Sequence, residues 1–77
     1  MTDTKAVKAL IKSKGIKLVY LAKELGISDN ALYMKLDNRT EFRTGEVAKL
    51  CEILGITSLK EKERLFFAKK DDLKSLE

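Results

Sequence analysis

Residues 18–35 of this chain read LVYLAKELGISDNALYMK, and this stretch decides the fold. Apolar residues at i, i+3, i+4 and i+7 predict a first amphipathic helix, and they are Leu18, Leu21, Ala22 and Leu25. Gly26 comes directly after them, where a left-handed glycine commonly ends a helix. Ser28 is a good N-cap for a second helix that would bury Leu32 and Leu36. Two short helices joined by a glycine-containing turn predict a helix-turn-helix unit.

The rest of the chain is predicted to add three helices and no strand. Cap residues and apolar spacing place them at about residues 4–14, at about residues 44–54, and after a capping box formed by Ser58 and Glu61. Three of the five predicted helices end in the same dipeptide, in Gly15-Ile16, Gly26-Ile27 and Gly55-Ile56. This repetition predicts one kind of C-cap, in which the isoleucine packs back on its helix.

Phenylalanines outside the helix-turn-helix unit are predicted to complete one small core. Phe42 would anchor the polar loop that follows the third helix. The pair Phe66-Phe67 would close the core beneath the first helix, with a dimer contact as the alternative for one ring. We expect one domain over residues 1–68 and a C-terminal tail over residues 69–77.

The composition argues against catalysis. The chain has no histidine, one cysteine and no glycine-rich phosphate loop, so we expect no enzyme, no cofactor, no metal site and no small-molecule substrate. Cys51 lies on an apolar helical face and is expected to be a small core residue. A lone cysteine cannot form an internal disulfide, which favours the reducing cytoplasm. The longest apolar run, residues 18–22, is far too short to span a bilayer.

Several segments together resemble the small Cro- and repressor-type (XRE-like) helix-turn-helix regulators of temperate phages. They are LAKELGIS at 21–28, ALYMKL at 31–36, EVAKLCEILGI at 46–56 and LFF at 65–67. The resemblance implies an all-α, compact five-helix lambda-repressor-like domain with the helix-turn-helix in helices 2 and 3. It also implies a transcription regulator, in the cytoplasm of a bacterial host, whose third helix is offered to the DNA major groove.

The outward face of the third helix holds the candidate recognition residues. With Leu32 and Leu36 turned inward, that face is predicted to carry Ser28, Asp29, Asn30, Ala31, Tyr33 and Met34. Asn30 is the best candidate base reader, because an asparagine amide can bind an adenine edge bidentately. For Tyr33 and Met34, partial burial in the core is the alternative.

Polar residues in the flanking turns and helix starts are candidates for contacts with phosphates or with a partner protein. They are Lys17, Lys35, Asn38, Arg39, Thr40, Arg43 and Thr44. For Lys35 and Arg39 the alternative is an ordinary solvated surface.

The start of the second helix does not suit DNA. Regulators of this type usually carry a glutamine there, followed by polar residues, whereas this chain has Leu18, Val19 and Tyr20. These three side chains would form an apolar partner patch, with the composition of a protein interface core. The alternative is that Val19 and Tyr20 pack under the C-terminal segment, against Leu73 and Leu76.

Charge is distributed unevenly along the chain. The net charge of +4 lies entirely in residues 1–27, because basic and acidic residues balance within 28–44 and within 45–77. Positive charge at the phosphates supplies most of the affinity of non-specific DNA binding, and the expected reading face, within 28–44, is neutral. Asp29 would even be repelled by phosphates unless it accepts a hydrogen bond from a cytosine amino group.

Two functional hypotheses follow, and both describe a transcription regulator of a temperate-phage lysis/lysogeny switch. In the first, the protein acts with or against the phage repressor through the face of helices 2 and 3, as the modulator-of-repression proteins of these phages do. In the alternative, it is an autonomous Cro-like repressor whose third helix reads operator DNA in the major groove. The expected partners are thus the phage repressor and operator DNA, alone or jointly, and no membrane. A purely structural helical bundle has only the lack of catalytic residues in its favour.

Overall fold

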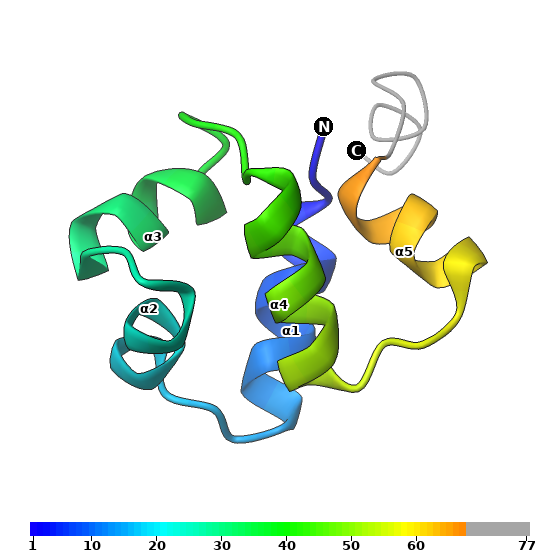
Figure 1. Cartoon of the computed structure of the whole chain (residues 1–77), viewed down its shortest axis with the longest axis horizontal. Helices are drawn as coiled ribbons and strands as arrows, with labels where there is room; N and C mark the ends of the chain where they lie inside the picture. Colours follow the sequence, from blue (N-terminus) through cyan, green and yellow to red (C-terminus); the bar gives the residue numbers. More distant parts are fainter. Residues whose placement is uncertain (68–77) are drawn as a thin grey trace.

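The computed structural model describes residues 1–67, in which the chain forms five helices and no strand. The helices are α1 (Thr4–Ser13), α2 (Leu18–Leu25), α3 (Asp29–Leu36), α4 (Thr44–Leu54) and α5 (Leu59–Phe66). Figure 1 places α2 and α3 on one side of α4 and α5 on the other. The predicted all-α architecture, with a helix-turn-helix at α2 and α3, is confirmed. The predicted tail over 69–77, and the packing against Leu73 and Leu76, lie outside the described residues.

The helices α1, α2 and α4 end with the same hydrogen-bond pattern. In each, the isoleucine after the glycine donates its N–H to the carbonyl five residues back. The pairs are Ile16–Ile11 at 3.2 Å, Ile27–Ala22 at 3.0 Å and Ile56–Cys51 at 2.8 Å. The glycine between helix and isoleucine has a positive φ in all three cases. The isoleucines also pack in or against the core, so the predicted C-cap is confirmed.

Gly26→Ala should lower the free energy of unfolding by about 1 kcal/mol, because an L side chain is strained at the φ of 71° found there. The added methyl would meet no atom within 4 Å, so the loss reports the backbone conformation alone. Gly45→Ala is the matched control, since Gly45 lies within α4, has open space at its Cβ and has no positive φ. Alanine there should stabilise α4 by up to about 1 kcal/mol. Urea denaturation measures the free energy of unfolding of both variants. Equal losses of stability would contradict the left-handed conformation of Gly26.

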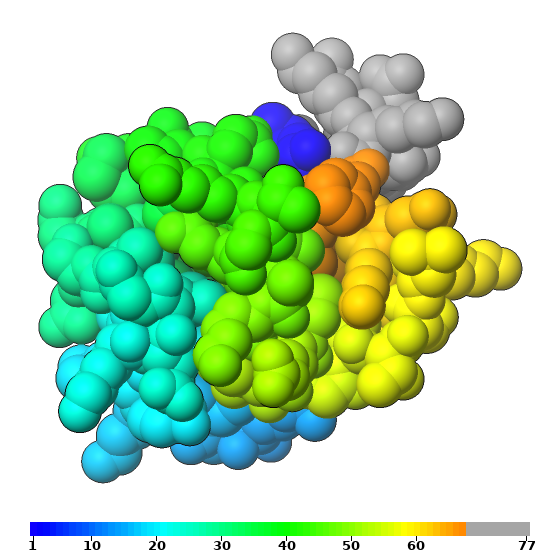
Figure 2. Space-filling view, in the orientation of Figure 1, coloured from blue at the N-terminus to red at the C-terminus, as the bar shows by residue number. Residues whose placement is uncertain are grey.

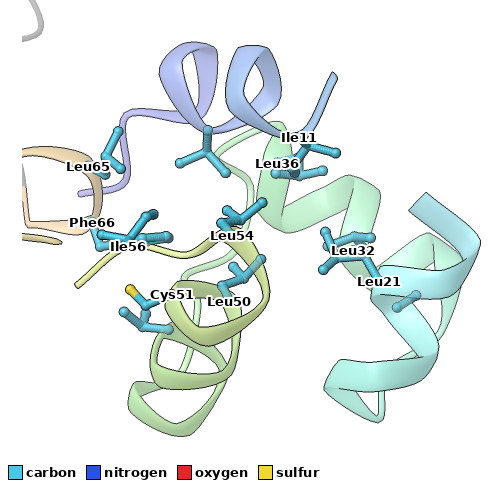
Figure 3. Packing of buried hydrophobic residues seen from close by; sticks show 13 residues of the cluster. Ile11, Leu21, Leu32, Leu36, Leu50, Cys51, Leu54, Ile56, Leu65 and Phe66 are labelled. Atoms are coloured by element: carbon cyan, nitrogen blue, oxygen red, sulfur yellow. The ribbon is translucent and has the colours of Figure 1, made fainter. Parts of the chain in front are cut away.

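Every helix contributes to one apolar core (Figure 3). Its buried members are Val7, Ile11, Leu21, Ala22, Leu32, Leu36, Val47, Leu50, Cys51, Leu54, Ile56, Leu65 and Phe66. Burial raises the pKa of the Cys51 thiol, which keeps it protonated and unreactive. Cys51 is therefore the small core residue that its position on α4 predicted.

Aromatic and backbone contacts fasten the loops to this core. The ring of Phe42 lies edge-on to that of Phe66, with centroids 6.3 Å apart, so Phe42 anchors the loop between α3 and α4 as predicted. Of the pair predicted to close the core, only Phe66 is buried, whereas Phe67 is 61% exposed. At the other end, the N–H of Asp3 donates to the carbonyl of Leu65 at 2.7 Å and ties the N-terminus to α5.

Candidate functional site

The two helices of the helix-turn-helix unit hold each other through buried apolar side chains. Leu21 and Ala22 of α2, and Leu32 of α3, are at most 1% exposed. Figure 3 shows Leu21 and Leu32 next to each other between the two helices. Ser28 caps α3, because its Oγ accepts the N–H of Ala31 at 3.1 Å. The buried positions and the cap were both predicted, and they turn the opposite side of α3 to solvent.

That opposite side carries polar and aromatic groups. Asp29 and Asn30 are exposed, and Tyr33 is 55% exposed, so these three residues lie where the sequence predicted them. Ala31 and Met34 are half-buried. The Nδ2 of Asn30 lies 3.8 Å from the Sδ of Met34, one turn along the helix. A thioether is a weak acceptor, so most of the hydrogen-bonding capacity of Asn30 remains for a partner.

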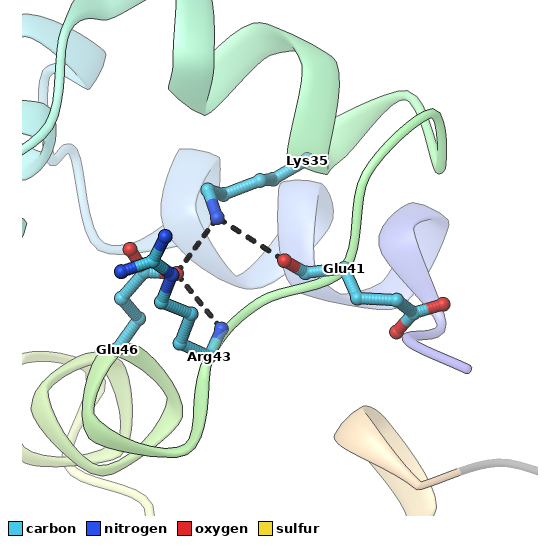
Figure 4. A network of polar contacts seen from close by, with 4 residues as sticks. All are labelled: Lys35, Glu41, Arg43 and Glu46. Atoms are coloured by element: carbon cyan, nitrogen blue, oxygen red, sulfur yellow. Dashed lines mark hydrogen bonds and ion pairs between the residues drawn. The ribbon is translucent and has the colours of Figure 1, made fainter.

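The position of Lys35 differs from the sequence prediction. It was expected to contact phosphate or a partner, but it is only 9% exposed and points into the molecule. Its Nζ donates to Glu46 Oε1 at 2.9 Å and to the carbonyl of Glu41 at 3.1 Å (Figure 4). The same Nζ lies 5.8 Å from the ring centroid of Phe42. A lysine engaged in this way has no charge to offer to a ligand. Its position one turn after the buried Leu32 was the signal that could have revealed this.

Glu46 joins two parts of the structure. One carboxylate oxygen accepts from Lys35 on α3, and the same oxygen accepts the backbone N–H of Arg43 at 2.8 Å, at the start of α4 (Figure 4). Burial alone would raise the pKa of Glu46, but the hydrogen bonds from Arg43 and Lys35 and their positive charges outweigh it and lower the pKa. Glu46 is therefore a structural anion that fastens α3 to α4.

The other basic candidates stay on the surface, but one of them is paired. Lys17 and Arg43 are exposed. Arg39 Nε donates to Asp37 Oδ2 at 2.8 Å, and both side chains are largely exposed. Such an exposed pair adds little stability, but the carboxylate reduces the positive potential of Arg39. Lys17 and Arg43 are thus the predicted basic contacts that remain without a side-chain ion pair within residues 1–67.

The polar uncharged candidates have different places in the structure: one shapes a turn and the other two lie on the surface. Asn38 has a φ of 59°, in the left-handed region that asparagine tolerates, and its Nδ2 donates to the Oγ1 of Thr4 at 3.4 Å. It therefore shapes the turn after α3 and ties it to α1. Thr40 and Thr44 are exposed and make no side-chain hydrogen bond within the described part of the chain.

The start of α2 presents apolar side chains to solvent. Val19 is 64% exposed and Tyr20 is 51% exposed, whereas Leu18 is half-buried against the core. Tyr20 donates its hydroxyl to Glu24 Oε1 at 3.3 Å, along its own helix. Leu18 and Tyr33 line the same groove, so the first turn of α2 adjoins α3. Figure 2 shows α2 and α3 adjoining at one side of the molecule.

In this small helical domain, α2 ends in a glycine turn and is followed by α3, whose outer side is exposed. This is the architecture of helix-turn-helix DNA-binding domains. Residues 6–61 match the family model of the Cro/C1-type HTH DNA-binding domain, and the chain belongs to this family. The match confirms the XRE-like resemblance and the class of DNA-binding transcription regulators. Comparison with curated proteins and with solved structures finds no match. In residues 1–67, no three potential metal ligands gather, and no helix is long and apolar enough to cross a membrane.

Proposed function

We propose that this protein is a transcription regulator of a temperate-phage lysis/lysogeny switch. It acts with or against the phage repressor through the face that α2 and α3 form. One observation carries the proposal: three large apolar or aromatic side chains, Val19, Tyr20 and Tyr33, are each more than half exposed on these two helices. Tyrosines surrounded by polar groups are typical of the centre of a protein–protein interface.

The charges of the same face support a protein partner over DNA alone. Residues 28–44 hold equal numbers of basic and acidic residues. Among the basic ones, Lys35 is paired with Glu46 inside the molecule and Arg39 with Asp37 on its surface. Asp29 is exposed at the start of α3, where a phosphate or a base edge would approach. A face with so little free positive charge gains little from the release of counterions from DNA.

The autonomous Cro-like repressor remains a second candidate, since Asn30 favours it. Asn30 is exposed in the first turn of α3 and has one weak side-chain contact, so its amide is available to an adenine edge in the major groove. Membership of a DNA-binding family agrees with this candidate as well.

A gel-shift titration distinguishes the two candidates. We expect the isolated protein to bind DNA from the region flanking its own gene only weakly, at micromolar concentrations or above, as in non-specific binding. Addition of the phage repressor should produce a complex that contains both proteins. Nanomolar, sequence-selective binding by the isolated protein, weakening steeply with salt, would contradict the partner proposal and establish the Cro-like repressor.

Substitutions in the same assay sharpen the result. Tyr20→Ala should weaken binding to the repressor by about tenfold or more, the effect typical of a buried interface tyrosine. Leu59→Ala is the matched control, because Leu59 is also a large, exposed hydrophobic side chain (71%) but lies on α5, remote from α2 in Figure 1. Asp29→Ala should improve DNA binding if DNA is the partner, because it removes a charge that phosphates repel. Unchanged repressor binding in Tyr20→Ala would remove the apolar patch from the interface.

A further inference from the structure

A groove of about 690 Å³ opens between α1 and α3, beside the first turn of α2. Its apolar lining comes from Ile11, Ile16, Leu18, Met34 and Leu36. Ile11 and Leu36 are buried core residues, whereas the other three are half-buried at the surface. The groove therefore presents an apolar strip to solvent at the edge of the α2/α3 face, formed by the three half-buried side chains above two buried core residues.

One wall of this groove is basic. Lys8 and Lys12 of α1 line it, both are exposed, and neither forms a salt bridge within residues 1–67. They lie one turn apart on the same side of a helix that contains no acidic residue. Like charges at this spacing repel each other and slightly destabilise the helix, so a bound anion would relieve α1 of a repulsion.

We propose that this groove binds an acidic amphipathic helix of the partner repressor, with apolar side chains on the strip and carboxylates against Lys8 and Lys12. This inference rests on the proposed function and names the chemistry of the partner. A helix lies in an apolar groove through residues at i, i+3 or i+4 and i+7. The groove is continuous with the proposed interface, because Leu18 and Tyr33 belong to both. Lys8 and Lys12 also supply part of the surplus positive charge of residues 1–27, which would complement the carboxylates of this helix.

A protein helix suits the groove better than a DNA backbone. Phosphates gain nothing from the apolar strip, and covering it with a charged backbone would desolvate charge against hydrocarbon. An amphipathic helix satisfies both parts of the site, since its apolar side covers the strip while its acidic flank meets the lysines.

The test uses the full-length, ¹⁵N-labelled protein and two synthetic peptides. Both peptides have about fifteen residues, near the length at which helices form in water, and the same leucine stripe. One carries glutamates on its flanks and the other lysines. The acidic peptide should shift the amide resonances of Ile16, Leu18 and Tyr33, and the basic peptide should not. Equal binding of both peptides would overturn the proposal, because it would leave charge complementarity no role.

The double variant Lys8→Glu/Lys12→Glu should weaken binding of the acidic peptide by about tenfold or more, and it should strengthen binding of the basic peptide. Lys23→Glu/Lys60→Glu is the matched control, since it changes the net charge equally at exposed sites that do not line the groove. An amide spectrum that is unchanged away from the substituted residues would show that each variant is folded. Equal losses in the two double variants would overturn the proposal.

Two further results separate this inference from the proposed function. If Tyr20→Ala abolishes repressor binding while Lys8→Glu/Lys12→Glu leaves it intact, the groove is not the helix site and the proposed function stands. If the acidic peptide binds as expected but the repressor does not, the groove chemistry stands and the repressor is not its partner. A short DNA duplex that shifts the same groove resonances and displaces the acidic peptide would assign the groove to phosphates and overturn the inference.

Discussion

Glu46→Ala is expected to lower the free energy of unfolding by about 3 kcal/mol, because it leaves the Lys35 ammonium buried without its counterion. Both side chains are only 11% exposed, so water compensates incompletely for the lost carboxylate. The backbone N–H of Arg43 loses its hydrogen-bond acceptor at the same time. For a domain of this size the melting temperature should fall by roughly 15 °C, as measured by circular dichroism.

Two variants and a pH series test this origin. Glu52→Ala, at an exposed position of the same helix, should change the stability little. Adding Lys35→Met to Glu46→Ala should recover part of the loss, since it removes the unpaired charge from the interior. The pKa of Glu46 is lowered from its ordinary value of 4.5, so its carboxylate stabilises the fold above that pH. The stability difference between wild type and Glu46→Ala should therefore shrink as the pH falls below about 4.5 through the lowered pKa. A difference independent of pH would refute the ion pair as its cause.

Leu32→Ala should also lower the free energy of unfolding by about 3 kcal/mol, the usual effect of truncating a fully buried leucine. Leu32 is 1% exposed and is one of only three buried side chains on the eight-residue α3. A helix this short has no stability of its own in water, so the loss should loosen the whole helix-turn-helix unit. Urea denaturation measures the stability, and amide hydrogen exchange in α3 measures the loosening.

The neighbouring residue provides the control. Tyr33 is more than half exposed on the opposite side of α3, so Tyr33→Ala should change the stability by less than about 0.5 kcal/mol. It should nevertheless weaken binding of the partner, because Tyr33 lies on the proposed interface. If both variants lost the same stability, the assignment of an inward and an outward side to α3 would be wrong.

The sequence predicted the helices well because several of their ends are chemically marked. Gly15, Gly26 and Gly55 adopt positive φ angles that other residues resist, and each is followed by an isoleucine that returns to the core. Ser28 and Ser58 are N-caps whose hydroxyls accept backbone N–H groups. Both signals depend on a few neighbouring residues, so they can be read without knowing how the helices pack.

The inward and outward sides of α3 were harder to predict. Lys35 was predicted to contact phosphate or a partner. Its spacing from Leu32 indicates an inward position, but only the tertiary arrangement brings it to Glu46, eleven positions along the chain. The groove between α1 and α3 was missed for the same reason, since Lys8 and Met34 come together only when the helices pack. Interactions between residues distant in the chain leave no local pattern to read.

The inward turn of Lys35 also has a consequence for recognition. Its ammonium holds the carbonyl of Glu41 and the side chain of Glu46 together, so the segment after α3 is fixed at its far end before any partner arrives. Asn38 fixes the near end through Thr4. A surface preorganised in this way gives up less conformational entropy on binding, so a larger share of the energy of its contacts appears in the affinity.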